Sequence, residues 1–225
     1  SHLLATCTGI ELTGSPLPIN HQNAFPLIHK PHTQDGGGPT TAVDPVVQIE
    51  RLSMWDGGTE KLVQINHPNL PQILGDRDLD GQMDSGFEKM FRFTDVIEIH
   101  PIESIFSKPE KDADYRKIRN PAFAWMQMLN LGYRIPGVVN TDAHYNYHGS
   151  GWMRNYIRCS TDDPARIETP EMIRQSEGGH LVMTTGPFLS ATLMGEQLSQ
   201  PAGPGEDVAL ASGKGELHVR VQCAN

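Results

Sequence analysis

The residues best suited to chemistry stand where apolar runs of the sequence stop. Asp142 and His144 close the run GVVNTDAH, and His67 follows the run KLVQIN and precedes a proline. Carboxylates and imidazoles are costly to bury without a partner, and both bind divalent cations well. The pattern raises a choice between a shared metal site and polar turns that are unrelated to one another.

Two further runs carry the same residue types. Glu11 ends the run LLATCTGIEL and His21 follows it in a loop, while Glu98 and His100 end the run DVIEIHP. A single histidine at a strand end is more often part of the hydrogen-bonded structure than a ligand. In β/α folds, however, functional groups gather at the carboxyl ends of strands. Repetition of such residues at four strand ends therefore favours one shared metal site.

The ligand types narrow the choice of metal. The three cysteines, Cys7, Cys159 and Cys223, lie far apart in the sequence and are expected to be small buried side chains. A mixed set of histidines and carboxylates suits Zn²⁺, Mn²⁺ or Fe at a catalytic site better than a closed, cysteine-based zinc site. Two or more such cations, bridged by carboxylates, would activate water for hydrolysis.

A framework of strands and helices has to position these residues. Strands are predicted within residues 3–12, 61–67, 95–100, 137–144, 154–161 and 181–186. Helices are predicted to begin at Asp44-Pro45, Asn120-Pro121 and Thr169-Pro170, where an N-cap residue precedes proline. Residues 15–41 are rich in proline, glycine and histidine and are expected to form a long loop. This alternation predicts an α/β fold of parallel β/α units, in a barrel or an open sheet.

After Gly186-Pro187 the sequence no longer alternates between strand-like and helix-like segments. Residues 1–186 are expected to form the hydrolase domain, whereas residues 187–225 contain two β-like runs divided by a Gly/Pro-rich loop. We interpret residues 187–225 as the start of an all-β module.

Composition limits the possible partners. The chain has 225 residues and a formal net charge of −9, with no Lys/Arg-rich run and no apolar run of membrane-spanning length. Nucleic acid and membrane are therefore not expected as partners, which weighs against a nuclease. A small molecule is the expected partner. The oligomeric state and the compartment stay open, with a periplasmic or secreted location favoured.

Several motifs occur in the order typical of a known family. They are GIEL, INHQN, VQINHP, VIEI, MLNLGYRIPGVVNTDAH and TTGPFLSATLMG. Together they resemble the PHP (polymerase and histidinol phosphatase) family, and most of all its carbaryl-hydrolase-like branch. The resemblance implies a distorted, TIM-like (β/α)7 barrel with two or three metal ions. It also implies hydrolysis of phosphoesters or, in this branch, of carbamate or other ester bonds.

The resemblance also implies roles for individual residues. The ligands would be Glu11 as the bridging glutamate, His21, His67, and the closing pair Asp142 and His144. Asp142 would also orient or deprotonate the attacking water, and Asp142 and His144 are the residues assigned to catalysis.

Four other residues have less direct expected roles. Glu98 and His100 would lie behind the metal ligands or near the substrate instead of binding metal. His148 and Arg154 follow the D-x-H element and could contact an anionic part of the substrate. The alternative for His148 and Arg154 is an ordinary place in a surface loop.

One departure from the family pattern concerns its H-x-H strand, which this chain lacks. His29 and His32 are a weak substitute because they follow Glu11 instead of preceding it. The simplest interpretation is that upstream barrel strands are missing from this chain. The other is an incomplete site, which would make the chain a non-catalytic binding module on the same fold.

An acidic segment, GDRDLDGQMDSGFE, suggests a second cation site. Asp76, Asp78, Asp80 and Asp84 occupy positions 1, 3, 5 and 9 of a calcium-loop pattern, with glycine at position 6. Position 12 is Phe87, where an EF-hand requires glutamate. The segment therefore predicts either a short calcium loop or a solvated acidic turn.

Overall fold

A computed structural model describes residues 5–15, 19–33, 37–70, 73, 87–99, 120–144, 151–196 and 198–223. The strands are β1 (Ile10–Thr13), β2 (His21–Phe25), β3 (Leu62–Ile65), β4 (Val96–Glu98), β5 (Gly137–Val138), β6 (Arg154–Ile157), β7 (Leu181–Thr184), β8 (Phe188–Met194) and β9 (Glu216–Gln222). The helices are α1 (Pro45–Gly58), the 3₁₀ helix η2 (Glu88–Phe93), α3 (Pro121–Asn130) and α4 (Thr169–Glu177). Among the described helices, none is both long and apolar enough to cross a bilayer.

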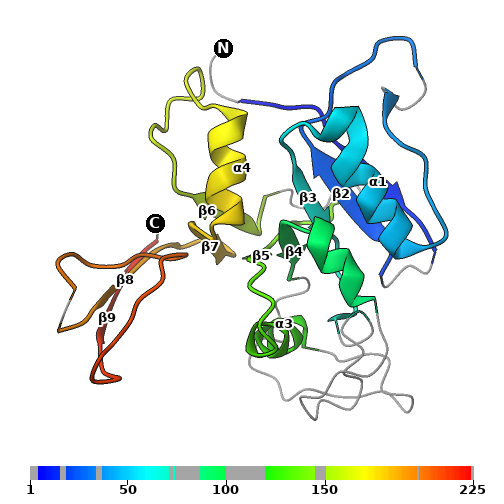
Figure 1. Cartoon of the computed structure of the whole chain (residues 1–225). Helices are drawn as coiled ribbons and strands as arrows, with labels where there is room; N and C mark the ends of the chain where they lie inside the picture. The colour runs from blue at the N-terminus through cyan, green and yellow to red at the C-terminus, as the bar shows by residue number, and fades with distance from the viewer. Residues whose placement is uncertain are drawn as a thin grey trace.

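The main sheet contains five strands in the order β1-β2-β3-β4-β5, with α1 lying across its β1–β3 part (Figure 1). Its β3–β4 and β4–β5 pairs are parallel, as expected for neighbouring strands of β/α units. The β1–β2 and β2–β3 pairs are antiparallel, so the sheet is mixed, because β2, a strand that was not predicted, lies between β1 and β3. Residues 14–20 connect β1 to β2, and this is fewer than the dozen or so residues that a crossover between parallel neighbours needs.

Strand β2 lies inside residues 15–41, which were expected to form a loop. Its residues alternate between buried and half-buried, and Gln22 and Ala24 are both 0% exposed. Hydrogen bonding to strands on both sides stabilises this five-residue segment despite the prolines and glycines around it.

Strand β1 is shorter and more exposed than predicted. It covers Ile10–Thr13 only, and of its residues only Leu12 is buried. As the first strand of the sheet, β1 pairs with a neighbour on one side. Because β1 continues to Thr13, Glu11 lies within the strand instead of ending it.

Two of the three predicted helix starts are confirmed. The carboxylate of Asp44 accepts a hydrogen bond of 2.8 Å from the Val46 N–H, and the side chain of Asn120 accepts one of 2.9 Å from the Phe123 N–H. In α4, Thr169 is instead the first helical residue, and Glu168 precedes it without a side-chain capping bond. Proline still stands in the first turn of all three helices, as its fixed φ favours.

The C-terminal part forms two separate antiparallel pairs. Strand β6 pairs with β7 instead of extending the main sheet, and β8 pairs with β9 in a hairpin that projects away from the rest of the chain (Figure 1). The hairpin agrees with the predicted β structure after residue 187. That it begins a separate module, and that residues 1–186 belong to a (β/α)7 barrel, stay predictions.

The cysteines differ from the expectation of buried side chains. Cys7 and Cys223 are exposed, Cys159 is half-buried, and all three are free thiols. Cys7 precedes β1 and Cys223 follows β9, so both lie next to strands that are largely exposed.

Candidate metal centre

The antiparallel direction of β2 brings His21 to the edge of the sheet where β1 and β3 end. His21 is the first residue of β2 and pairs with Thr13, the last residue of β1. Its carbonyl also accepts a hydrogen bond of 2.9 Å from the N–H of Asn66, just beyond β3. His21 was predicted in a loop, yet the strand places it at the same edge that the sequence argument required.

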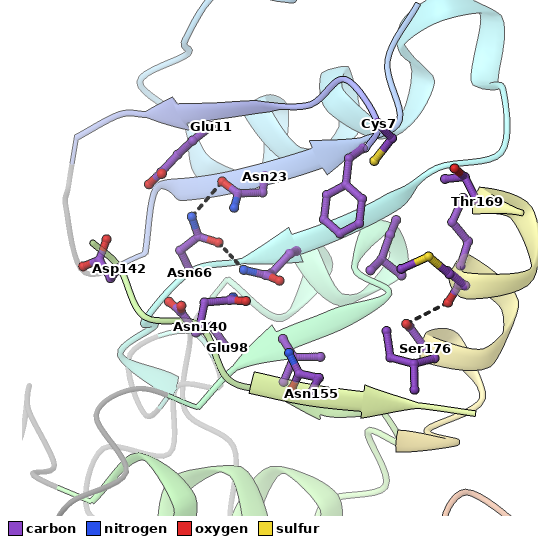
Figure 2. Close-up of a pocket in the computed structure, with 17 residues that line it drawn as sticks. Cys7, Glu11, Asn23, Asn66, Glu98, Asn140, Asp142, Asn155, Thr169 and Ser176 are labelled. Atoms are coloured by element: carbon purple, nitrogen blue, oxygen red, sulfur yellow. Dashed lines mark hydrogen bonds between the residues drawn. The ribbon is translucent and has the colours of Figure 1, made fainter. Parts of the chain in front are cut away.

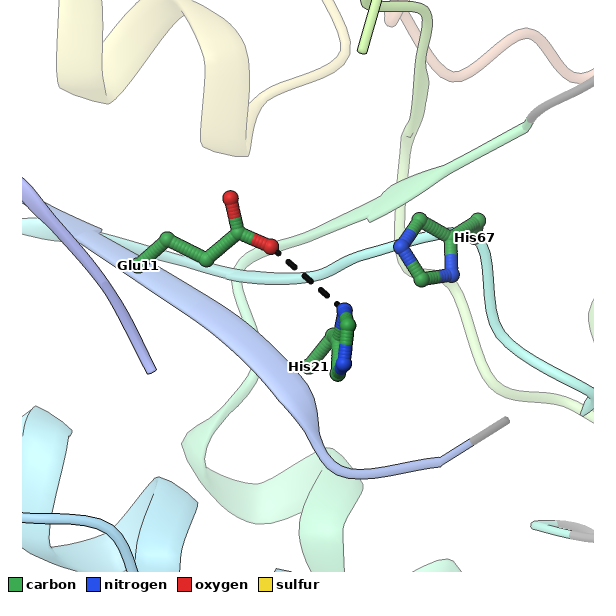
Figure 3. Close-up of side chains that lie close together, drawn as sticks. All are labelled: Glu11, His21 and His67. Carbon is green, nitrogen blue, oxygen red and sulfur yellow. Dashed lines mark ion pairs between the residues drawn. The ribbon is translucent and has the colours of Figure 1, made fainter. Parts of the chain in front are cut away.

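Glu11, His21 and His67 form a cluster at this edge (Figure 3). One possible ligand atom from each side chain lies within 4.8 Å of those of the other two. Glu11 Oε1 is 3.5 Å from His21 Nδ1, and the rings of His21 and His67 meet edge to face with centroids 4.9 Å apart. Such spacing suits ligands that share one cation, because metal–ligand bonds are about 2 Å long.

The environment of His21 fits a metal ligand. Its side chain is 13% exposed, and both ring nitrogens are buried without a hydrogen-bond partner among the described residues. Burial lowers the pKa of His21, and the nearby charge of His67 lowers it further, against the opposing effect of Glu11 and Asp142. The neutral imidazole that results has a lone pair available for a cation.

His67 is held in an unusual backbone conformation. Its φ is +27°, and its N–H donates a hydrogen bond of 2.6 Å to Oε2 of Glu98, which is 3% exposed. Positive φ is uncommon for residues other than glycine and persists where surrounding contacts enforce it. Glu98 thus supports the backbone of a candidate ligand, and its role behind the metal site stays a prediction.

Asp142 and His144 lie outside the Glu11–His21–His67 cluster. Asp142 has φ +48° and its Oδ1 is 3.1 Å from His144 Nε2. Asp142 is nevertheless close enough to raise the pKa of His21, and it lines the same cavity as Glu11 (Figure 2). The five predicted ligands therefore fall into a group of three and a neighbouring pair.

Three of the remaining candidate site residues lie in the part of the chain that the structure describes. Arg154 is an exposed residue at the start of β6, and His29 and His32 are exposed and do not join the cluster. The other candidates lie outside the described residues: His100, His148, Asp76, Asp78, Asp80 and Asp84.

A cavity of about 250 Å³ beside the cluster contains residues that the sequence analysis missed. Three of them form a row of amides: Gln64 donates to Asn66, and Asn66 donates to Asn23, each at 2.8 Å (Figure 2). Asn140 and Asn155 also line the cavity. Gln64 lies in the apolar strand β3, and Asn66 directly follows the strand. Polar residues two positions apart point to the same face of a strand, and this spacing could have revealed the pair from the sequence.

Comparison of the chain with protein-family models gave no match, and neither did comparison with curated proteins or with solved structures. The family resemblance of the motifs therefore stays a prediction, and the function is inferred from the residues of the site itself.

Proposed function

We propose that the chain is a metal-dependent hydrolase that cleaves a phosphoester or a carboxylic or carbamic ester bond. The observation that supports this most is the Glu11–His21–His67 cluster, in which both ring nitrogens of His21 are buried and make no hydrogen bond to the described residues, although Nδ1 lies 3.5 Å from Glu11 Oε1. Buried polar atoms without partners are rare because they lose their hydrogen bonds to water. A divalent cation at the cluster would compensate for this loss, and the carboxylate of Glu11 would balance part of its charge.

The residues around the cluster have distinct roles in this proposal. Glu11, His21 and His67 hold the cation, and Glu98 fixes the backbone of His67. When bound, such a cation lowers the pKa of water and stabilises negative charge on oxygen. Asp142 orients the attacking water through its carboxylate and accepts the proton, while His144 beside it keeps that carboxylate in place.

The test combines metal binding with hydrolysis. Protein purified without chelator is analysed for metal, and Zn²⁺ binding to the chelator-treated protein is measured by calorimetry. His21→Ala and His67→Ala should each weaken Zn²⁺ binding by at least about tenfold, because each removes one ligand. Asp142→Asn should retain the fold and abolish hydrolysis of p-nitrophenyl butyrate and p-nitrophenyl phosphate.

His218→Ala provides the matched control, since His218 is an exposed histidine on β9. It should bind Zn²⁺ as the wild type does. Equal Zn²⁺ affinity in His21→Ala, His67→Ala and the wild type would refute the metal centre. Full turnover in Asp142→Asn would refute the role of that carboxylate.

A non-catalytic module that binds a cation is the second candidate. It is favoured by one observation, namely that Asp142 and His144 lie outside the cluster of three. This candidate predicts Zn²⁺ binding that depends on His21 and His67, with no metal-dependent turnover of any ester.

A further inference from the structure

We infer that the cavity beside the metal centre binds the uncharged, apolar part of an ester substrate, so that neutral esters are accepted and esters with an anionic tail are rejected. The inference rests on the proposed function and specifies the substrate class of the same site. It follows from how charge, amide groups and apolar side chains are distributed along the cavity.

One end of the cavity is polar and adjoins the metal centre. Glu11 and Asp142 lie together at this end, near Asn66 and Asn140 (Figure 2). Glu11 belongs to the cluster itself, so a ligand in the cavity has one end within reach of the proposed cation. The bond to be cleaved would therefore lie at this end.

The other end of the cavity is mainly apolar, and its polar residues Thr169 and Ser176 carry no charge (Figure 2). Phe25 pairs with Leu62 across β2 and β3, at the opposite ends of those strands from His21 and Asn66. Leu62, Val138 and Ile173 are buried in one apolar cluster, against which Phe25 packs, and all four residues line the cavity. An apolar group bound here would gain about 25 cal/mol for each Å² that it removes from water.

The charged side chains of the cavity are all acidic. Among the described residues that line it, the ionisable ones are Cys7, Glu11, Glu98 and Asp142, with no lysine, arginine or histidine. Glu98 is 3% exposed, so its carboxylate lies in a poorly solvated interior. An anionic group on the distal part of a substrate would lose its hydration and meet no cation there.

Between these ends, the cavity offers uncharged hydrogen-bonding groups. The amides of Asn23, Gln64 and Asn66 form one connected row, which fixes the direction of their donors and acceptors. Amides suit a neutral carbonyl or ether oxygen, since they orient a ligand without requiring a charge. The volume of about 250 Å³ lies just below that of pockets for drug-sized ligands, so the bound group is small.

The first test measures binding separately from catalysis. Zn²⁺-loaded protein is titrated by NMR with N-methylbutanamide and with N-methylsuccinamate, which differ by a terminal methyl group against a carboxylate. The neutral amide should bind at least about tenfold more tightly, because burial of an unpaired carboxylate is costly. The ratio of kcat/KM for p-nitrophenyl butyrate and p-nitrophenyl hemisuccinate should show the same preference.

Two variants locate the binding to this cavity. Met172 lines it from α4, and Met172→Trp should weaken binding of N-methylbutanamide about tenfold without a change in Zn²⁺ affinity. Met126→Trp is the matched control, since Met126 is 47% exposed on α3 and does not line the cavity. Thr169→Lys, which adds a cation at the end away from Glu11, should reduce the preference for the neutral amide (Figure 2).

The outcomes separate this inference from the proposed function. Equal binding of the two amides, tighter binding of the carboxylate, or no effect of both Met172→Trp and Thr169→Lys would overturn the inference. Selective binding of the neutral amide without hydrolysis of either ester would overturn the hydrolase and leave the cavity assignment standing.

Discussion

The backbone N–H of His67 donates a hydrogen bond of 2.6 Å to the buried carboxylate of Glu98 at the end of the neighbouring strand. This bond joins the Glu11–His21–His67 cluster to the interior of the sheet. It accounts for the conformation of His67, whose φ of +27° needs support from outside its own segment.

The first prediction concerns this positioning role. Glu98→Ala should weaken Zn²⁺ binding about 10–100-fold, because loss of a group that supports a ligand disturbs the geometry of the ligand. Glu98→Gln keeps an oxygen acceptor and should retain most of the affinity. Calorimetric Zn²⁺ titration measures both, with Glu216→Ala on the exposed strand β9 as the control. If Glu98→Ala folds and binds Zn²⁺ with wild-type affinity, the positioning role is wrong.

The second prediction separates a metal ligand from a structural histidine. His21→Phe removes two buried nitrogens that have no hydrogen-bond partner, so the free energy of unfolding without metal should stay equal or rise by about 1 kcal/mol. The stabilisation that saturating Zn²⁺ gives, about 4 kcal/mol at 1,000 times Kd, should shrink markedly. Urea unfolding with and without Zn²⁺ measures both effects. A large loss of stability in the metal-free variant would instead indicate a structural role.

The third prediction follows from Asp95. Burial raises the pKa of Asp95 from 3.8 to about 6, although its carboxylate accepts a hydrogen bond of 2.7 Å from the Val63 N–H. The folded state therefore holds this proton more tightly than the unfolded state. Between about pH 4 and 6 the contribution of Asp95 to the free energy of unfolding should fall as pH rises, by at most about 3 kcal/mol.

Asp95→Asn tests this contribution, because asparagine still offers an oxygen to the Val63 N–H but carries no charge. The variant should be more stable than the wild type at pH 7, and its stability should depend less on pH between 4 and 6. Urea unfolding across this pH range provides the measurement, and Asp162→Asn on the surface is the control. Parallel pH profiles for Asp95→Asn and the wild type would contradict the prediction.

The fourth prediction concerns Lys61, a lysine that is 6% exposed. Its ammonium donates to the carbonyls of Ser53, Trp55 and Thr59 at 3.2, 2.8 and 2.7 Å, where the end of α1 turns toward β3. Lys61→Met should lower the free energy of unfolding by about 2–4 kcal/mol, since it removes three hydrogen bonds from a charged donor that is itself buried. Lys214→Met on the exposed surface should change it by less than about 0.5 kcal/mol.

Local signals in the sequence predicted local structure well. Asp44 and Asn120 cap their helices because the capping bonds join residues only two or three positions apart. The parallel pairs of β3, β4 and β5 also follow from runs whose type is evident locally. Strand β2 was missed because pairing with β1 and β3 stabilises it, and its own five residues do not reveal those contacts.

Only part of the site could be predicted, again because contacts between distant segments leave no local signal in the sequence. His67 lies just beyond β3 and Glu98 ends β4, and because these strands are parallel, both residues were expected at the same edge of the sheet. His21 reaches that edge through an antiparallel strand, which the argument did not include. The amides of the cavity were missed because asparagine and glutamine signal no chemistry individually, and the bond that joins Asn66 to Asn23 links segments that are far apart in the sequence.

The pairing of β1 with β2 has a consequence for how the site tolerates sequence change. His21 and Asn23 stand two residues apart on β2, so they occupy the same face of that strand. A slip of one residue against β1 would turn both to the opposite face in a single step. An insertion or deletion between the two strands would thus remove a ligand and an amide together, even with every side chain of the site unchanged.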